Sequence, residues 1–391
     1  MAEALILSAV RTPIGRFMGG LSEVPAPRLG AIVVREAVQR AGIDSVSVDE
    51  VIMGNVLPAG LGQAPARQAA IGAGLPDTVG ALTINKMCGS GLKAVMLAAQ
   101  GIRAGDGEVY VAGGMENMSL APYLLPKARA GYRLGHGEIT DSMIRDGLWD
   151  AYRDCHMGSC AELLAAEYRI SRADQDEYAV RSYRLAIEAL DRGCFASQTV
   201  PVPVSDGKTP TVVTEDEEPR RVNFEKIPTL RPVFERDGTV TAANASSISD
   251  GAAALVVVSD AVAERAGRPP MARIVGYATA ATAPEWFTIA PAYAIERLLG
   301  RVGWSKDDVD LYEINEAFAA VVLGVCRKIG LPLDKVNVHG GAVALGHPLG
   351  ASGARILTTL LYAMAERDVR RGVAGICLGG GEAVAVAVER V

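Results

Sequence analysis

A repeated order of predicted strands and helices constrains this 391-residue chain more than any other feature of its sequence. Three segments of the second half resemble three segments of the first half, in the same order and at nearly constant spacing. The paired segments are 310–315 with 50–55, 351–357 with 89–95, and 375–380 with 109–114. The repeat predicts a duplicated α/β fold in which corresponding turns of the two halves surround one cleft.

The length and the repeat predict more than one packed domain. Predicted strands and helices alternate in residues 1–120, and the strand pattern resumes at 239–268, so we assign both segments to an N-terminal half. Residues 121–238 break the alternation with glycine, proline and charge, and we interpret them as an inserted loop domain. Within it we expect 206–221 to be a mobile surface excursion. Residues 269–391 form the predicted C-terminal half.

Composition excludes several classes of protein. A net charge of −6 and an isoelectric point near 5.5 argue against a general nucleic-acid binder. No run reaches the roughly 18 apolar residues of a membrane span, and the first residues resemble a strand, so we expect a cytoplasmic protein. The six cysteines contain no Cys-x-x-Cys pair, which predicts reduced thiols and no metal site.

One cysteine stands at a predicted turn between a strand and a helix. Ala81–Ile84 is apolar, small residues surround Cys88, and strong helix formers follow from residue 92. The N–H groups and dipole at a helix start favour a thiolate, and Gly89 and Gly91 would let a substrate approach the backbone. The turn therefore predicts a reactive cysteine, although a lone cysteine can also be a small buried apolar residue.

Three turns of the second half carry side chains that complement Cys88, and the repeat predicts that they converge on it. The reactive residues of these turns are Asn315, His347 and Cys377. Such a set suits acyl transfer, because a thiolate can attack a thioester, an imidazole can take the thiol proton, and a second thiol can move a proton on carbon. Asn315 and the N–H groups of Cys88 and Gly379 are candidate oxyanion donors, each worth about 3 kcal/mol.

Taken together, the motifs resemble those of the thiolase family over essentially the full length. The motifs are Ser8-Ala-Val-Arg-Thr-Pro13, Asn85-x-x-Cys88-x-Ser90-Gly91, Asn244-Ala-Ser246-x-x-x-Asp250-Gly-Ala-Ala253, Asn315-Glu-Ala-Phe318, Asn337-x-x-Gly-Gly-x-Val-Ala-x-Gly346-His347-Pro348 and Cys377-x-Gly-Gly-Gly381. The resemblance implies two duplicated α/β halves in a five-layer αβαβα arrangement with an inserted loop domain. It also implies acyl-CoA and CoA as substrates, no separate cofactor, and a homotetramer.

The resemblance also implies roles for the residues. Cys88 would carry the acyl group, and His347 would activate it. Cys377 would be the acid and base that exchanges a proton with the methyl carbon of acetyl-CoA. Asn315, through a water molecule, and His347 would hold one thioester oxygen. The N–H groups of Cys88 and Gly379 would hold the oxygen of the acetyl-enzyme.

Further residues are assigned to CoA by the same resemblance. His156 and Met157 match the loop-domain motif that lines the CoA tail, and Ser246 matches a serine near the pantetheine. Arg220 or Arg221 is a candidate for contact with the CoA phosphates. His339 occupies a position where an ordinary polar residue is expected, and we interpret it as a structural histidine.

Three side chains bear on the length of the acyl group. If Met157, Phe287 and Phe318 line its far end, they leave room for only a short chain, which favours acetyl-CoA C-acetyltransferase activity. The alternatives are a degradative 3-ketoacyl-CoA thiolase of β-oxidation and a related protein that binds acyl-CoA without thiolysis. A cysteine hydrolase is a weaker alternative, because a second cysteine serves carbon chemistry better than attack by water.

Overall fold

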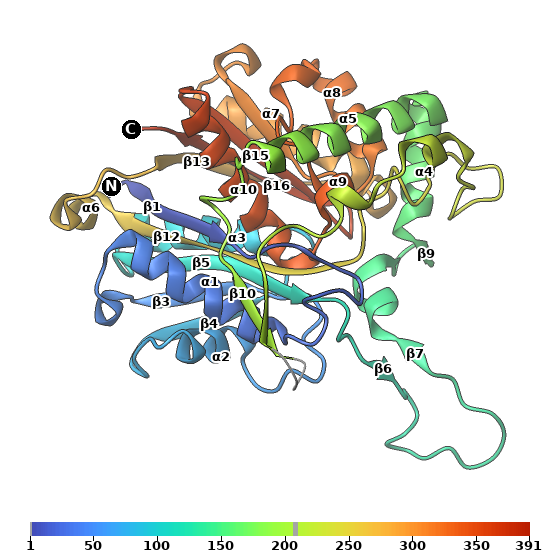
Figure 1. Cartoon of the computed structure of the whole chain (residues 1–391), viewed down its shortest axis with the longest axis horizontal. Helices are drawn as coiled ribbons and strands as arrows, with labels where there is room; N and C mark the ends of the chain where they lie inside the picture. Colours follow the sequence, from blue (N-terminus) through green and yellow to red (C-terminus); the bar gives the residue numbers. More distant parts are fainter. Residues whose placement is uncertain (1, 206–209) are drawn as a thin grey trace.

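The computed structural model describes residues 2–205 and 210–391. Within these residues one ten-stranded sheet has the order β14-β15-β16-β13-β1-β12-β5-β3-β4, with the short β2 beside β12. Its two parts are joined where β1 (Ala4–Arg11) meets β13 (Ala272–Ala281), and this pairing involves only two residues of each strand. The sheet is therefore two nearly separate sheets that touch at one edge (Figure 1).

The two parts repeat one topology. The order β1-β12-β5-β3 in the first recurs as β13-β16-β15-β14 in the second, with matching parallel and antiparallel pairings, and the edge strand β4 has no counterpart among the described strands of the second part. The predicted duplication is confirmed.

The first part contains β2 (Gly15–Arg16), α1 (Ala26–Ala41), β3 (Glu50–Gly54), α2 (Pro65–Gly72), β4 (Gly80–Ile84), α3 (Ser90–Ala104), β5 (Val109–Asn117), β12 (Ser249–Ser259) and α6 (Asp260–Ala266). The second contains α7 (Ala290–Val302), β14 (Leu311–Ile314), α8 (Ala319–Ile329), α9 (Ala342–Leu345), α10 (Leu349–Glu366), β15 (Arg371–Leu378) and β16 (Glu382–Glu389).

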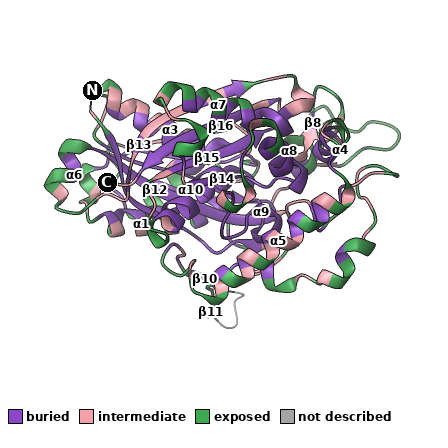
Figure 2. Cartoon of the chain, turned by 90° about the horizontal axis from the view of Figure 1, so that it is seen from above, coloured by how far each residue is buried: buried purple, intermediate pink, exposed green. Residues whose placement is uncertain are grey.

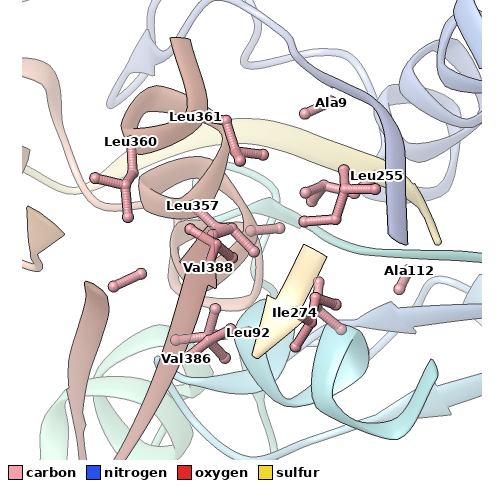
Figure 3. Close-up of a cluster of buried hydrophobic side chains, with 14 of the residues drawn as sticks. Ala9, Leu92, Ala112, Leu255, Ile274, Leu357, Leu360, Leu361, Val386 and Val388 are labelled. Atoms are coloured by element: carbon pink, nitrogen blue, oxygen red, sulfur yellow. The ribbon is translucent and has the colours of Figure 1, made fainter. Parts of the chain in front are cut away.

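Helices α3 and α10 form the central layer between the two parts of the sheet. Their side chains Leu92 and Leu357 lie in one apolar cluster with Leu255 of the first part and Val386 of the second (Figure 3). Helices α1 and α2 pack on the outer face of the first part, and α7 and α8 on that of the second. The predicted five-layer αβαβα arrangement is confirmed.

The central strands are buried on both faces, which explains their continuous apolar sequences. All residues of β5 and of β12 are buried, as expected of strands covered by helices on both sides. In Figure 2 β12 is purple, whereas green appears on the covering helices such as α1 and α8. Within the described residues, no helix combines the length and apolar composition needed to cross a membrane.

The segment between β5 and β12 contains two long helices and several short hairpins. Its helices are α4 (Met157–Glu167) and α5 (Arg172–Asp191), and the connection between β6 (Tyr123–Leu124) and β7 (Thr140–Asp141) extends away from the body (Figure 1). Its remaining strands are β8 (Trp149–Asp150), β9 (Cys155–His156), β10 (Val202–Ser205) and β11 (Pro210–Val213). The predicted division into domains stays a prediction.

One expectation for this segment is partly wrong. Residues 206–209 of the predicted mobile excursion lie outside the described residues. Further along, however, Asp216 is buried and pairs with the buried Arg11 of β1 at 2.6 Å. A charged sequence was interpreted as solvated surface, but an ion pair between residues 205 positions apart fixes it to the sheet.

Candidate active site

A cavity of about 400 Å³ opens between the two halves and the inserted segment. Eight of the predicted site residues line it, namely Cys88, His156, Met157, Ser246, Phe287, Phe318, His347 and Gly379. Its surface is predominantly apolar, and Leu148, Phe234, Ile248 and Leu349 line it although the sequence did not indicate them. The structure thus brings residues from turns that are far apart in the chain to one site.

The turn before α3 presents Cys88 to this cavity. Met87 has a positive φ of 46°, which is costly for a residue with a side chain. Three hydrogen bonds hold it there: Met87 N–H donates to Asn85 Oδ1 at 2.9 Å, Lys86 N–H donates to Ser90 Oγ at 2.8 Å, and Ser90 Oγ–H donates to the Met87 carbonyl at 2.6 Å. Asn85 and Ser90, which flank Cys88 in the motif, therefore fix the shape of the turn.

The resting state of Cys88 differs from the expectation. Burial raises the pKa of the thiol to about 12, although the N–H groups of Cys88 and Gly379 lower it. The effect of burial on the pKa is thus larger than that of the N–H groups at the helix start, and Cys88 is a thiol. The same two N–H groups were predicted to hold the acetyl-enzyme oxygen, and both point at this sulfur.

The role expected of the neighbouring glycines is also wrong. A Cβ at Gly89 would lie 2.0 Å from Leu378 Cδ2, and one at Gly91 would lie 2.8 Å from the Ala354 nitrogen. Both glycines therefore face protein, where they permit close packing of α3 against β15 and α10. They allow the two halves to approach each other and leave no space for a substrate at these positions.

His347 is held in one orientation at the start of α10. Its Nδ1 lies 2.5 Å from Ser352 Oγ, and this hydroxyl donates to the Pro348 carbonyl at 2.9 Å. Ser352 Oγ is therefore the acceptor from Nδ1–H, so Nε2 carries the lone pair. Burial, and then the positive charge of Arg355, lower the pKa of His347 to about 3. His347 is a neutral imidazole whose lone pair lies on Nε2.

Asn315 follows β14 directly and meets His347. Its Nδ2 lies 3.4 Å from His347 Nε2, while its Oδ1 accepts from an Arg355 N–H at 3.4 Å. Asn315 is buried behind the cavity and is not among the residues that line it. The Arg355 contact orients the amide so that its NH₂ group faces the imidazole and the site.

Glu316, the residue after Asn315, holds this turn in place through hydrogen bonds within the protein interior. Its buried carboxylate accepts hydrogen bonds from Tyr178 Oη–H (2.8 Å), Ser182 Oγ–H (2.7 Å), Asn337 Nδ2–H (2.9 Å) and Val343 N–H (3.0 Å). These donors come from α5 and from the segment that leads to His347. The acid therefore ties the Asn315 turn to the His347 loop, a long-range role that the sequence did not reveal.

Cys377 lies near the end of β15, behind residues that line the cavity. It is fully buried in an apolar cluster with Met157, Phe287 and Phe318. Burial, and then the neighbouring Cys88, raise the pKa of its thiol. Cys377 is accordingly protonated, as Cys88 is.

Glu116 is a second buried acid that the sequence did not single out. At the end of β5 its carboxylate accepts from Val56 N–H (2.9 Å), Leu57 N–H (3.1 Å), Gly350 N–H (2.8 Å) and Asn55 Nδ2–H (2.7 Å). Burial raises its pKa to about 7, against the effect of these hydrogen bonds. Glu116 joins the first half to the start of α10, the helix that follows His347.

Two residues that the sequence analysis assigned to CoA form another part of the cavity wall. His156 stacks on Phe234 with ring centroids 4.6 Å apart, and its Nδ1 accepts from Gly158 N–H at 3.1 Å. Burial lowers the pKa of His156, so the ring is neutral. Ser246 Oγ–H donates to the Ala317 carbonyl at 2.9 Å, which leaves its lone pairs available at the cavity wall.

Arg220 is the predicted site residue for which the structure offers the least support. Within the described residues it lies outside the cavity lining, and its guanidinium pairs with Asp191 at 2.8 Å. Both side chains of this pair are about half exposed. The assignment of Arg220 or Arg221 to the CoA phosphates stays a prediction without a contact behind it.

Comparison with known proteins gives one consistent result. Residues 4–261 match the family model of the thiolase N-terminal domain, and residues 268–390 match that of the thiolase C-terminal domain. The acetyl-CoA acetyltransferase of Pseudomonas aeruginosa is 52% identical over 392 residues and that of Escherichia coli 53% over 393, each covering 100% of both chains. The crystal structure of the Bacillus anthracis acetyl-CoA acetyltransferase has a TM-score of 0.98 at 45% identity, covering 100% of this chain and 99% of that one. Because the matches extend over both halves and the inserted segment, the chain belongs to the thiolase family.

Proposed function

We propose that this thiolase is an acetyl-CoA C-acetyltransferase, which joins two acetyl-CoA molecules into acetoacetyl-CoA and CoA and also cleaves acetoacetyl-CoA. One observation carries the proposal: two thiols, a neutral imidazole and the predicted oxyanion donors gather around one apolar cavity. The similar proteins named acetyl-CoA acetyltransferases support the same activity. Acyl-CoA and CoA are the substrates, and no separate cofactor takes part.

In the first half of the reaction the acetyl group moves to Cys88. The Cys88 thiol gives its proton to His347 Nε2 while its sulfur attacks the thioester carbonyl. The N–H groups of Cys88 and Gly379 stabilise the oxygen that becomes negative. When the carbon–sulfur bond to CoA breaks, Cys377 gives its proton to the leaving CoA thiolate, so Cys377 is left as a thiolate.

In the second half a carbon–carbon bond forms. The Cys377 thiolate removes a proton from the methyl group of a second acetyl-CoA, and the donors at Asn315 and His347 stabilise the resulting enolate. The enolate carbon attacks the acetyl-Cys88 carbonyl, and the bond to Cys88 sulfur breaks. The Cys88 sulfur recovers the proton stored on His347, so every group returns to its starting state.

The walls of the cavity favour a short acyl chain. Met157, Phe287 and Phe318 are all buried and pack around Cys377, so the space beside the reacting carbon is closed by bulky side chains. A long 3-ketoacyl chain would have to displace at least one of them. The second candidate function, a degradative 3-ketoacyl-CoA thiolase, requires such a displacement.

The test is cleavage of acetoacetyl-CoA in the presence of CoA, followed by loss of enolate absorbance and formation of acetyl-CoA. We expect rapid cleavage by the parent and none by Cys88→Ala or Cys377→Ala. Cys326→Ala is the matched control, since Cys326 lies in the apolar cluster of the C-terminal half away from the cavity. Faster cleavage of a 3-ketoacyl-CoA of ten or more carbons would favour the degradative activity.

Two other outcomes identify the remaining alternatives. Acylation of Cys88 without cleavage of acetoacetyl-CoA would indicate a protein that binds acyl-CoA without thiolysis. Release of free acid in place of acyl-CoA would indicate a hydrolase. Single-turnover experiments with labelled acetyl-CoA, followed by mass analysis of the acyl-enzyme, separate these cases from a thiolase.

We infer a homotetramer as the working assembly. The edge strand β4 leaves Leu82 exposed, and the extended connection between β6 and β7 carries exposed Leu125, Leu134 and Ile139. Edge strands and exposed apolar loops are sites where further chains pack. Light scattering that gives the mass of a monomer would refute the assembly. The cytoplasmic location stays a prediction.

A further inference from the structure

Outside the active site, three side chains with metal-binding atoms meet where α5, α10 and the loop before α9 come together. They are Cys194, just after α5, His339 in the loop, and Glu366, the last residue of α10. Their ligand atoms all lie within 4.8 Å of one another. We propose that this cluster, which we name the Cys-His-Glu cluster, binds a divalent transition metal ion of the zinc type.

The contacts of His339 provide the main argument. The side chain is only 3% exposed, Nε2 is in close polar contact with Glu366 Oε2 at 2.9 Å, and Nδ1 has no hydrogen-bond partner among the residues that the structure describes. A buried polar group without a partner is costly, and native structures rarely keep one without a reason. An imidazole with one unpaired nitrogen, held this close to a carboxylate, is an arrangement that a shared cation would satisfy.

The ligand types and distances agree with this interpretation. Cys194 Sγ lies 3.7 Å from Glu366 Oε1, on the same carboxylate that faces His339. A zinc ion with bonds of about 2.0–2.3 Å keeps its tetrahedral ligand atoms roughly 3.5 Å apart. Thiolate, imidazole and carboxylate are the usual protein ligands of zinc, and three of them leave the fourth position to water. Binding would displace the thiol proton of Cys194 into solvent.

Two arginine side chains lie near the Cys-His-Glu cluster, and one of them would compete with a metal ion. The guanidinium of Arg192 contacts Glu366 Oε1, and Arg367 also lies near His339. The Arg192 side chain is 52% exposed, so it can move into water at little cost, because exposed ion pairs contribute only about 0–1 kcal/mol. Metal binding therefore competes with Arg192 for one carboxylate.

A metal ion at this location would stabilise the fold, because its three ligands come from different segments of the chain. His339 lies in the loop that leads through α9 to His347, while Cys194 and Glu366 lie at the ends of two helices. A metal ion bound by all three would crosslink these helix ends to the loop. We expect the bound form to unfold at a higher temperature than the metal-free form.

The experiment uses the full chain with Cys88→Ser as the background, so that the active-site thiol does not contribute. The chelator-treated protein is titrated with Co²⁺, and absorbance is recorded for the thiolate-to-metal charge-transfer band and the bands of tetrahedral cobalt. We expect one Co²⁺ per chain, displacement by Zn²⁺, and a rise in unfolding temperature with Zn²⁺. No charge-transfer band at one equivalent would overturn the proposal.

Single variants then test each ligand. Cys194→Ser should abolish the charge-transfer band, and His339→Asn and Glu366→Gln should each weaken binding at least about tenfold. Arg192→Gln should strengthen binding, the opposite of what a purely structural ion pair predicts. His136→Asn, at an exposed loop histidine, is the matched control and should bind as the background protein does. A charge-transfer band that survives Cys194→Ser would assign the metal to another thiol and refute the cluster.

Discussion

The buried ion pair between Arg11 and Asp216 allows a quantitative test of how the inserted segment is attached. Arg11 donates to both carboxylate oxygens of Asp216, at 2.6 and 2.8 Å, and Ile14 N–H donates to the same carboxylate at 2.8 Å. The side chains of the pair are 0% and 1% exposed. Replacement of Asp216 by alanine leaves the guanidinium buried without its counter-ion.

The expected cost follows from these contacts. Removal of one partner of a buried ion pair costs about 3–5 kcal/mol, because the other charge stays uncompensated. Arg11 keeps the hydrogen bond from Nε–H to Gln198 Oε1 at 2.9 Å and its position over the Phe195 ring, so the guanidinium retains some compensation. We therefore expect Asp216→Ala to lower the free energy of unfolding by about 4 kcal/mol, a large part of the roughly 5–15 kcal/mol of a folded protein.

The assay is urea unfolding, followed by tryptophan fluorescence at one fixed protein concentration. The matched control is Asp191→Ala, which removes the partner of the half-exposed Arg220 and should cost about 0–1 kcal/mol. The double variant Arg11→Met with Asp216→Leu should recover most of the loss, since buried pairs can be replaced by apolar residues. If Asp216→Ala shifts the midpoint no more than Asp191→Ala, the pair does not stabilise the fold in the way argued.

Three further predictions concern the site itself. Gly89→Ala should destabilise the fold by about 1–3 kcal/mol and reduce turnover, because the new Cβ would lie 2.0 Å from Leu378 Cδ2; unchanged urea unfolding would contradict this. Burial lowers the pKa of His347 from 6.5 to about 3, so its contribution to stability is present above pH 6.5 and is lost as the pH falls toward 3. The free energy of unfolding of the parent should therefore fall more steeply over this pH range than that of His347→Gln. The two slopes should differ by at most about 1.4 kcal/mol per pH unit, the value for one proton. Equal slopes would refute a neutral buried ring. Met157→Ala or Phe287→Ala should raise kcat/KM for a six-carbon 3-ketoacyl-CoA relative to acetoacetyl-CoA by about tenfold or more, and an unchanged ratio would show that these side chains do not limit chain length.

Much of the fold was predictable because its information is local and repeated. Apolar runs between glycine-rich turns indicate buried strands, and the same order of runs in both halves predicts the same order of strands. The convergence of Cys88 and His347 followed from that repeat, because equivalent turns of a duplicated fold lie at the same edge of their sheets. The partners that orient them, such as Ser352 and Glu316, could not be predicted, since their hydrogen bonds depend on side-chain geometry.

The sequence by itself determined the family and the duplicated topology and singled out the candidate catalytic residues, because each is recorded in short segments that act through their own backbone and residue types. Only the tertiary structure decided the state of those residues. Cys88 is a thiol because burial removes its water, and Gly91 faces Ala354 because two helices approach each other. Likewise Asp216 is buried and His339 meets Glu366 only because distant segments pack together. Burial and long-range contacts depend on the whole chain, so no local pattern of residues could have specified them.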